Sequence, residues 1–371
     1  MTGTHDQDPY RAELRARVRA FVDQWRTDRH VEPTCDSWMR GFDPEFSRAL
    51  AARGWIGITW PTEFGGAGSS NRDRLAVTEE LLRAGAPIAA HWIGDRQIGP
   101  AILRHGTEEL RKELLPAITA GEAVYCLGMS EPGAGSDLAS VTTRADRVEG
   151  GWRVSGRKVW TSHAHHATHM YLLARTEKAE RKHQGLSEFV LDLPSEGIEI
   201  SPIRDLSGEH HFNEVVLDGV FVPEHRLLGT AGDGWRQVVE QLSFERGGPE
   251  RVLSTYPLLA ELIGHPTARQ PHIATRLGGL AARLATLRRL AWELAGALDD
   301  GRAPVQEAVT LKYLGNAFEC SVVELAREVF GAGGGAGARL FRGALAAQPG
   351  FTIRGGAADV LLGLLAREEA R

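Results

Sequence analysis

The stretch YCLGMSEPGAGSDLASVTTR, from Tyr125 to Arg144, decides how the rest of the chain is interpreted. Its core, SEPGAGSD, sets Gly133 and Gly135 between two serines. Glycine lets a backbone approach a ligand closely and permits positive φ angles, and hydroxyl and backbone N–H groups can bind carbonyl and phosphate oxygens. The stretch lacks both the Gly-Lys-Ser/Thr of a P-loop and the GxGxxG pattern of a Rossmann fold. It therefore predicts a ligand-binding turn of another kind, with an ordinary helix-to-strand turn as the alternative.

The segments on either side of this stretch have different textures. Helical periodicity is expected at 9–55, 72–84 and 97–118, and again from Gly234 to the end of the chain. Between 124 and 228, short β-like runs alternate with Gly, Pro and Asp, and Ser155–Gly156 is expected to be a turn between two such runs. Segregated helices and strands predict an α+β protein. We expect an N-terminal helical domain at 1–122, a central antiparallel β-domain at 123–230 and a C-terminal four-helix bundle at 231–371.

Composition excludes several classes of protein. The chain has 371 residues, 42% of them hydrophobic, and a net charge of −5, which gives no sign of nucleic-acid binding or of a polybasic membrane patch. The three cysteines form neither a CxxC pair nor a disulfide framework. The first residues do not look like a signal peptide, and no apolar run is long enough to span a bilayer. These features predict a cytoplasmic globular protein.

Three further motifs accompany SEPGAGSD in order along the chain: WPTEFGGAG (Trp60 to Gly68), GWRVSGRKVWTS (Gly151 to Ser162) and FNEVVLDGVFVP (Phe212 to Pro223). Together they resemble the acyl-CoA dehydrogenase family over nearly the whole chain. In that family the first is a loop of the N-terminal domain, the second a flavin-facing β-hairpin and the third the end of the β-domain. The resemblance implies a flavoenzyme that holds FAD against an acyl thioester, with a dimer or tetramer completing the site.

The resemblance also implies which residues bind the cofactor: Leu127, Met129, Ser130, Gly135, Ser136, Trp160 and Ser162. Trp160 would lie beside the isoalloxazine ring, since a flat apolar surface suits a flat cofactor; a core tryptophan is the alternative. Ser136 would lie near the cofactor or the pantetheine arm of the substrate. The family's Arg-x-x-Phe-Gly motif for the FAD diphosphate is missing, and Arg269 is the nearest candidate, with a solvated surface arginine equally compatible.

The implied reaction is α,β-dehydrogenation, in which a carboxylate removes the α proton and the β hydrogen leaves as hydride to the flavin. Many members place that glutamate near the C-terminus, but the matching position here is Gly355. A minority carry it on the first long helix of the C-terminal domain, just before an arginine. Glu245 and Arg246 match that pattern, with Arg246 expected to contact substrate and Glu250 as the weaker candidate base.

Partners and metals complete the expectations. The departures from the common motifs also fit a subunit of a heteromeric dehydrogenase that completes a partner's FAD site without being catalytic. An electron-transferring flavoprotein is the expected acceptor, although oxygen stays open, as do the acyl group and the choice between a CoA and a carrier-protein thioester. Histidines cluster after Trp160 (His163, His165, His166 and His169), but no cysteine lies nearby and no metal is expected. His210–His211 is expected to be a solvated turn.

Overall fold

The chain is built from two compact units. The computed structural model describes residues 8–331 and 333–369, except for the side chains of 242–245 and 367–369. One unit comprises the described parts of Met1–Phe42, Ser69–Ala89 and Ser243–Arg371, and the other comprises Asp43–Gly68 and Ala90–Leu242. Within the described residues, no helix is both long enough and apolar enough to cross a membrane.

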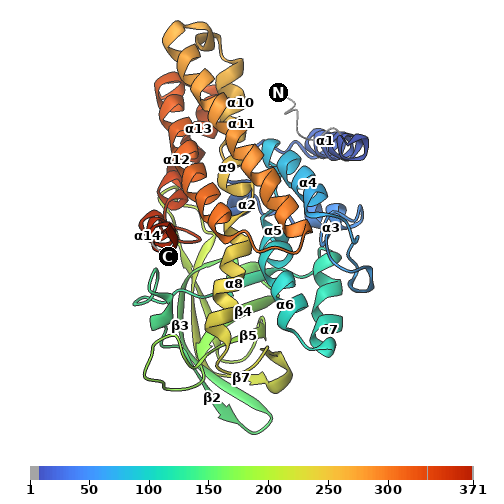
Figure 1. Ribbon diagram of the computed structural model, residues 1–371, viewed down its shortest axis with the longest axis vertical. Coiled ribbons are helices and arrows are strands. Elements are labelled where there is room, and N and C mark those ends of the chain that lie inside the picture. The colour runs from blue at the N-terminus through green and yellow to red at the C-terminus, as the bar shows by residue number, and fades with distance from the viewer. Residues whose placement is uncertain (1–7, 332, 370–371) are drawn as a thin grey trace. The chain divides into compact units, whose positions relative to one another are not determined.

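The first unit is helical. Its elements are α1 (Pro9–Arg29), α2 (Ser37–Arg40), α4 (Asn71–Arg83), α9 (Glu250–Leu253), α10 (Tyr256–Gly264), η6 (Pro266–Arg269), α11 (Pro271–Asp299), α12 (Val305–Phe330), α13 (Gly335–Phe351) and α14 (Ala358–Glu369). The long helices α11, α12 and α13 run alongside one another (Figure 1). On α11 the buried residues recur at helical spacing, as a bundle requires: Leu280, Leu284, Leu287, Ala291 and Leu294.

The second unit combines short helices with a β-sheet. The helical elements are α3 (Pro44–Ala51), η1 (Thr62–Phe64), α5 (Ala89–Ile93), the π-helix η2 (Gly94–Ile98), α6 (Gly99–His105), α7 (Glu108–Thr119), η3 (Leu138–Ser140), η4 (Ala164–His166) and η5 (Glu224–Arg226). Helix α8 (Gly234–Arg246) begins in this unit and ends in the other. The elements follow the expected order of helices, strands and helices.

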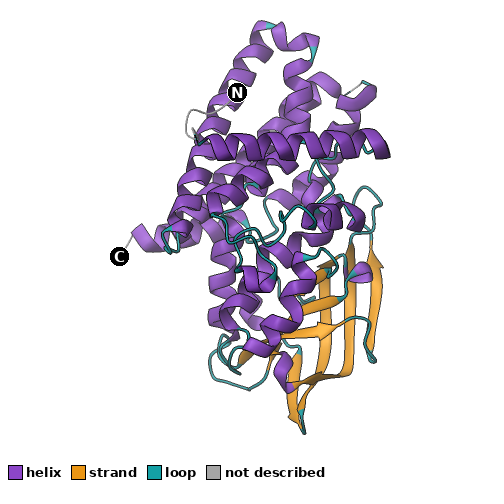
Figure 2. Ribbon diagram, turned by 90° about the vertical axis from the view of Figure 1, so that its right-hand side faces the viewer, coloured by secondary structure: helices purple, strands orange, loops and turns teal. Residues whose placement is uncertain are grey.

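The strands of the described residues form one sheet (Figure 2). They are β1 (Tyr125–Gly128), β2 (Arg144–Val148), β3 (Gly151–Ser162), β4 (His169–Arg175), β5 (Leu186–Asp192), β6 (Ile198–Ile203), β7 (Phe212–Pro223) and β8 (Leu227–Leu228). The order is β6-β7-β3-β2-β4-β5-β8, with β1 beside β4. The pairings are antiparallel except β1 with β4 and β2 with β4, which are parallel.

The expected turn at Ser155–Gly156 is wrong, because β3 continues through it. The register against β7 shifts between Val154 and Gly156, which marks a bulge rather than a reversal. Glycine is required at 156 because a Cβ there would lie 2.3 Å from the Thr143 Oγ1 atom. The Ser155 hydroxyl accepts a hydrogen bond from the Gly219 N–H on β7 at 3.1 Å. A close approach of two chain segments, not a hairpin, explains the Ser-Gly pair.

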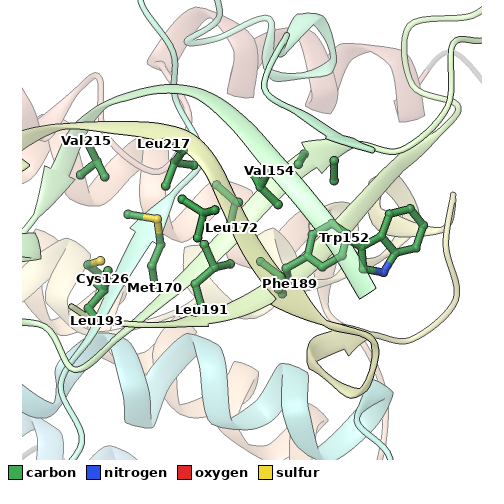
Figure 3. Packing of buried hydrophobic residues seen from close by; sticks show 14 of the residues in the cluster. Cys126, Trp152, Val154, Met170, Leu172, Phe189, Leu191, Leu193, Val215 and Leu217 are labelled. Atoms are coloured by element: carbon green, nitrogen blue, oxygen red, sulfur yellow. The ribbon is translucent and has the colours of Figure 1, made fainter. Parts of the chain in front are cut away.

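One face of the sheet encloses the apolar core of this unit. Figure 3 shows side chains of β3 and β7 facing those of β4 and β5, including Trp152, Leu217, Met170, Leu172 and Phe189. The rings of Trp152 and Phe189 meet edge to face at 5.6 Å. Side chains alternate along a strand, so the residues of β4 between these point to the opposite face. There Leu173 and Leu186 pack with Val238 of α8, and Met129 and Trp235 lie against the same cluster.

A buried hydroxyl–carboxyl pair joins β4 to β5. The Tyr171 Oη atom donates to Glu188 Oε2 at 2.5 Å, and both side chains are fully buried. Burial raises the pKa of Glu188 to about 8; Glu240 adds to the rise, and the hydrogen bond from Tyr171 opposes it. Glu188 is therefore protonated in the folded chain at neutral pH.

This shift predicts a pH-dependent effect of Glu188→Gln on stability. As pH rises from about 4.5 to about 8, the unfolded chain releases the Glu188 proton and the folded chain keeps it, so stability falls. Glutamine keeps the acceptor for Tyr171 and has no proton to lose. The melting temperature of Glu188→Gln relative to that of wild type should therefore be higher at pH 8 than at pH 5, as measured by calorimetry. Glu149→Gln, at an exposed position, is the control; an equal difference at both pH values would contradict the burial argument.

Candidate functional site

The backbone of the SEPGAGSD loop is fastened to β3. The Val159 N–H donates to the Ser130 carbonyl oxygen at 2.9 Å, and the Lys158 Nζ atom donates to the Met129 carbonyl oxygen at 3.1 Å. Leu127, Met129 and Ser130 are half-buried, whereas Gly135 and Ser136 are exposed. The structure thus places Met129 and Ser130 against β3, the strand that also carries Trp160 and Ser162.

A buried ion pair lies beneath this loop. Glu131 accepts from Lys158 Nζ at 2.9 Å, from the Thr143 N–H at 2.9 Å, and from the N–H and hydroxyl of Thr142, both at 2.7 Å. The Lys158 ammonium also donates to the Leu173 carbonyl oxygen at 2.8 Å. Sequence reasoning missed both residues, although they lie inside motifs quoted for other reasons. The pattern carried no signal, because a lysine in a strand is usually on the solvent face.

The charges of this pair depend on their partners. Burial raises the pKa of Glu131, but the Lys158 ammonium and the hydrogen bonds from Thr142 and Thr143 outweigh it and hold the pKa below its usual range. Burial lowers the pKa of Lys158, and Glu131 opposes that shift. At neutral pH the pair is a carboxylate and an ammonium, each with its hydrogen bonds satisfied within the β-sheet unit.

Trp160 breaks the regular strand geometry. Its φ angle is +59°, and the register with β7 shifts between Lys158 and Thr161. Positive φ is costly for a bulky residue and is found where a side chain must be re-aimed. The indole ring is 59% exposed and meets the Phe212 ring edge to face at 5.7 Å. A core position for Trp160 is thereby excluded, and the strand presents an open aromatic surface beside the half-buried Ser162.

The two glycines of the loop, Gly133 and Gly135, have ordinary backbone conformations and open space around them. Neither Gly133 nor Gly135 has a positive φ angle. A Cβ atom at either position would meet nothing within 4 Å. The loop backbone is therefore accessible in this unit, as a group that binds through N–H donors requires.

The candidate residues of the helical unit meet at the turn between α13 and α14. Gly355 and Gly356 have φ angles of +68° and +106°. The Arg246 Nε atom donates to the Gly355 carbonyl oxygen at 3.5 Å, and the buried Lys312 Nζ atom donates to the Gly356 carbonyl oxygen at 3.0 Å. The end of α8 is thus attached to this glycine turn. Glu245 immediately precedes Arg246 on α8, and its side chain lies outside the described residues.

The other two candidates of this unit, Arg269 and Glu250, lie away from this turn along the chain and differ in exposure. Arg269 is exposed at the end of η6. Glu250 is buried at the start of α9, with its carboxylate 3.6 Å from Arg251. A further ion pair could not be seen in the sequence: the half-buried Arg354, next to the glycine turn, donates to both carboxylate oxygens of the buried Asp36 at 2.5 and 2.7 Å.

The histidines form a ring cluster at the tip of the sheet. His165 and His210 stack at 3.9 Å between centroids, and both bond the Asn213 Oδ1 atom. His211 is buried, so the expected solvated turn at 210–211 is wrong. Asp205, Glu209 and His211 have potential ligand atoms within 4.8 Å of one another. Asp205 also accepts from the N–H and hydroxyl of Ser207, as a turn-capping aspartate does, and this group by itself assigns no metal.

Models of three domains match the chain in order: the acyl-CoA dehydrogenase N-terminal domain over 9–122, the middle domain over 126–220 and the C-terminal domain over 259–369. The chain therefore belongs to the acyl-CoA dehydrogenase family, whose members bind FAD. It is 31% identical over 336 residues to acyl-CoA dehydrogenase FadE29 of Mycobacterium tuberculosis, covering 88% of this chain and 86% of that one. It is 42% identical over 202 residues to acyl-CoA dehydrogenase IpdE1 of the same species, covering 54% of this chain and 52% of that one, so this match spans about half of the relative.

Solved structures agree over the whole chain. A steroid ACAD, Tcur3481-Tcur3483, superposes with a TM-score of 0.88 at 27% identity over 98% of both chains. The ChsE4-ChsE5 complex from Mycobacterium tuberculosis superposes with a TM-score of 0.84 at 26% identity, over 99% of this chain and 98% of that one. The expected α+β architecture is confirmed. The residues present also fit FAD, since the accessible loop backbone is hydrogen-bonded through Ser130 to β3, the strand that carries the exposed Trp160 ring.

The backbone at Gly355 predicts that a glutamate placed there is strained. A side chain other than glycine in the left-handed region costs about 1–2 kcal/mol, and asparagine less. Gly355→Glu should therefore lower the free energy of unfolding by about that amount in urea denaturation, and Gly355→Asn by clearly less. A Gly355→Glu chain as stable as wild type would show that the turn can adopt another conformation.

Proposed function

We propose that this chain is a FAD-dependent dehydrogenase that introduces an α,β double bond into an acyl thioester, carried on CoA or on a carrier protein. The observation that carries the proposal is Trp160, an exposed ring held at a positive φ angle beside the fastened Met129–Ser130 backbone. Membership of the acyl-CoA dehydrogenase family supports it. The proposed enzyme has three domains, at 1–122, 123–230 and 231–371, and a cytoplasmic location.

Most of the expected binding residues suit the cofactor in this setting. Bound FAD would supply the acceptor for the two electrons that leave the substrate. Trp160 would cover one face of the ring and exclude water from it, and the hydroxyls of Ser130 and Ser162 would donate to its polar edge. The remaining contacts are assigned to Leu127, Met129, Gly135 and Ser136, with Arg269 on the diphosphate. Ser136 and Arg246 would contact the substrate.

Glu245 is the proposed base. Glycine at 355 has no proton acceptor, so the carboxylate must come from another element. Arg246 contacts the Gly355 carbonyl oxygen, and this contact brings the end of α8 to the turn that commonly carries the family's glutamate. Its neighbour Glu245 is therefore the nearest replacement along the chain, and it would take the α proton from the substrate. Glu250, already packed against Arg251, is less suited.

A second candidate function follows from the same turn. Gly355 and Gly356 leave the common base position empty of side chains, and the solved relatives include assemblies of two different chains, Tcur3481-Tcur3483 and ChsE4-ChsE5. This chain would then complete a partner's FAD site without being catalytic itself. An electron-transferring flavoprotein is the proposed acceptor for the catalytic form, which would be a homodimer or tetramer.

Cofactor content separates these functions. The full chain should be purified alone and after co-expression with a second dehydrogenase subunit, and should show the absorbance of oxidised flavin. The released flavin should be FAD by chromatography. A panel of acyl-CoA esters with an artificial electron acceptor then identifies the substrate. Flavin in the chain alone with turnover supports the catalytic form, and flavin only in the co-expressed complex supports the partner. A colourless protein in both preparations would refute the flavoprotein assignment.

Glu245→Gln tests the base directly. Glutamine keeps the shape and hydrogen-bonding capacity of glutamate but cannot take a proton, so substrate-driven flavin reduction should slow by about a hundredfold or more in stopped flow. FAD content and melting temperature should stay close to wild type. Glu250→Gln, five residues further along the chain at the start of α9, is the matched control and should retain most of the rate. A fast Glu245→Gln with a slow Glu250→Gln would reverse the assignment.

A further inference from the structure

We propose that the buried Lys158–Glu131 pair is the positioning element of the cofactor site: it fixes the peptide between Met129 and Ser130 in the orientation that binds flavin. The inference rests on the proposed function and adds to it two residues that contact no ligand themselves. Their effect on FAD would pass through the backbone they hold.

The first step concerns the ammonium group. Lys158 is completely buried, and its three N–H donors are matched by three acceptors: the Met129 carbonyl at 3.1 Å, the Glu131 carboxylate at 2.9 Å and the Leu173 carbonyl at 2.8 Å. These acceptors belong to the segment after β1, the loop itself and β4. One side chain therefore ties three segments together, and the Met129 carbonyl is turned inward as a result.

The second step concerns the loop ends. Glu131 bonds the Thr142 and Thr143 N–H groups on the far side of the loop, eleven and twelve residues along the chain. Glu131 and Ala134 also exchange backbone hydrogen bonds at 3.0 and 3.1 Å. Both ends of the loop are thus closed onto one carboxylate. The exposed tip, Pro132 to Gly135 with Ala134 as its buried residue, is held in place from beneath.

The third step concerns the direction of the neighbouring side chain. Residues two apart on a strand normally point to the same face, so Trp160 would follow Lys158 into the interior. The positive φ angle of Trp160 and the register shift beside it turn the ring outward instead, from a neighbour with 0% exposure to one with 59%. On β3, Lys158 therefore fixes the loop, and the bulge that follows it exposes the Trp160 ring two residues later.

Charge removal separates this positioning role from simple stability. In Lys158→Met the Glu131 carboxylate stays buried without its cation, which destabilises the chain strongly. In the double variant Lys158→Met with Glu131→Gln, both charges are gone and the volume is kept, so most of the stability should return. The donor to the Met129 carbonyl is still missing. If the pair positions the loop, FAD affinity stays low in the double variant although the fold has recovered.

The experiment measures melting temperature of the apo chain and the FAD dissociation constant by flavin fluorescence quenching, on the full chain or its co-expressed complex. We expect Lys158→Met to have a lower melting temperature than wild type and a higher FAD dissociation constant. The double variant should approach the wild-type melting temperature while its FAD dissociation constant stays at least about tenfold above wild type, with a shifted visible flavin band. The control, Arg288→Met with Glu79→Gln, removes an ion pair between a half-buried arginine on α11 and a buried glutamate on α4, joined by two hydrogen bonds at 2.8 Å, and should leave FAD affinity unchanged.

The outcomes are distinct. Wild-type FAD affinity in the double variant overturns the positioning role and leaves the proposed function standing. An equal loss of affinity in the Arg288–Glu79 control means that any buried pair has this effect, and it also overturns the inference. A wild-type chain that binds no FAD, alone or with its partner, overturns the proposed function and the inference together. A double variant that does not fold also overturns the inference, because the pair would then be required for the fold itself and not for the orientation of the loop.

Discussion

Two opposite charges are buried within the sheet, and neither can stay there without the other. Desolvating an ion costs several kcal/mol, and the cost is offset only when geometry and hydrogen bonds are good. Lys158 and Glu131 meet that condition by gathering the Met129, Leu173, Thr142 and Thr143 backbone groups around them. These bonds connect β4, the segment after β1 and both ends of the SEPGAGSD loop.

The constraint extends to the aromatic surface. Because β3 is fixed at Lys158 and pairs with β7 on either side, the irregularity needed to expose a ring is confined to the residues between Lys158 and Thr161. The positive φ angle at Trp160 is energetically unfavourable, and the hydrogen bonds between β3 and β7 on either side of it hold the backbone in that conformation. The same principle operates in the helical unit, where Arg246 and Lys312 hold carbonyl groups of a turn that only glycine adopts easily.

The glycine pairs of this chain illustrate how much a motif can and cannot predict. Ser155–Gly156 was expected to reverse the chain, yet it lies inside a strand. Glycine is needed at 156 because Thr143 approaches too closely for any side chain there. Gly355–Gly356 was identified as a departure from a catalytic motif, and its left-handed backbone explains why glycine is tolerated there. The sequence shows both glycine pairs, but only the structure shows the reason for each: a close approach of Thr143 at Gly156 and a left-handed backbone at Gly355 and Gly356.

Periodicity and the ordered motifs determined the architecture and the family, and they singled out the stretch that we propose for the cofactor, because these depend on local patterns of side chains and on residues close together in the chain. They also located Trp160 and the loss of the usual base. Only the tertiary structure decided that Trp160 is exposed, that Lys158 and Glu131 are paired beneath the loop, and that Arg246 contacts the Gly355 turn. Burial and pairing join residues 27 and 109 positions apart, and no local pattern encodes which distant partner satisfies a charge.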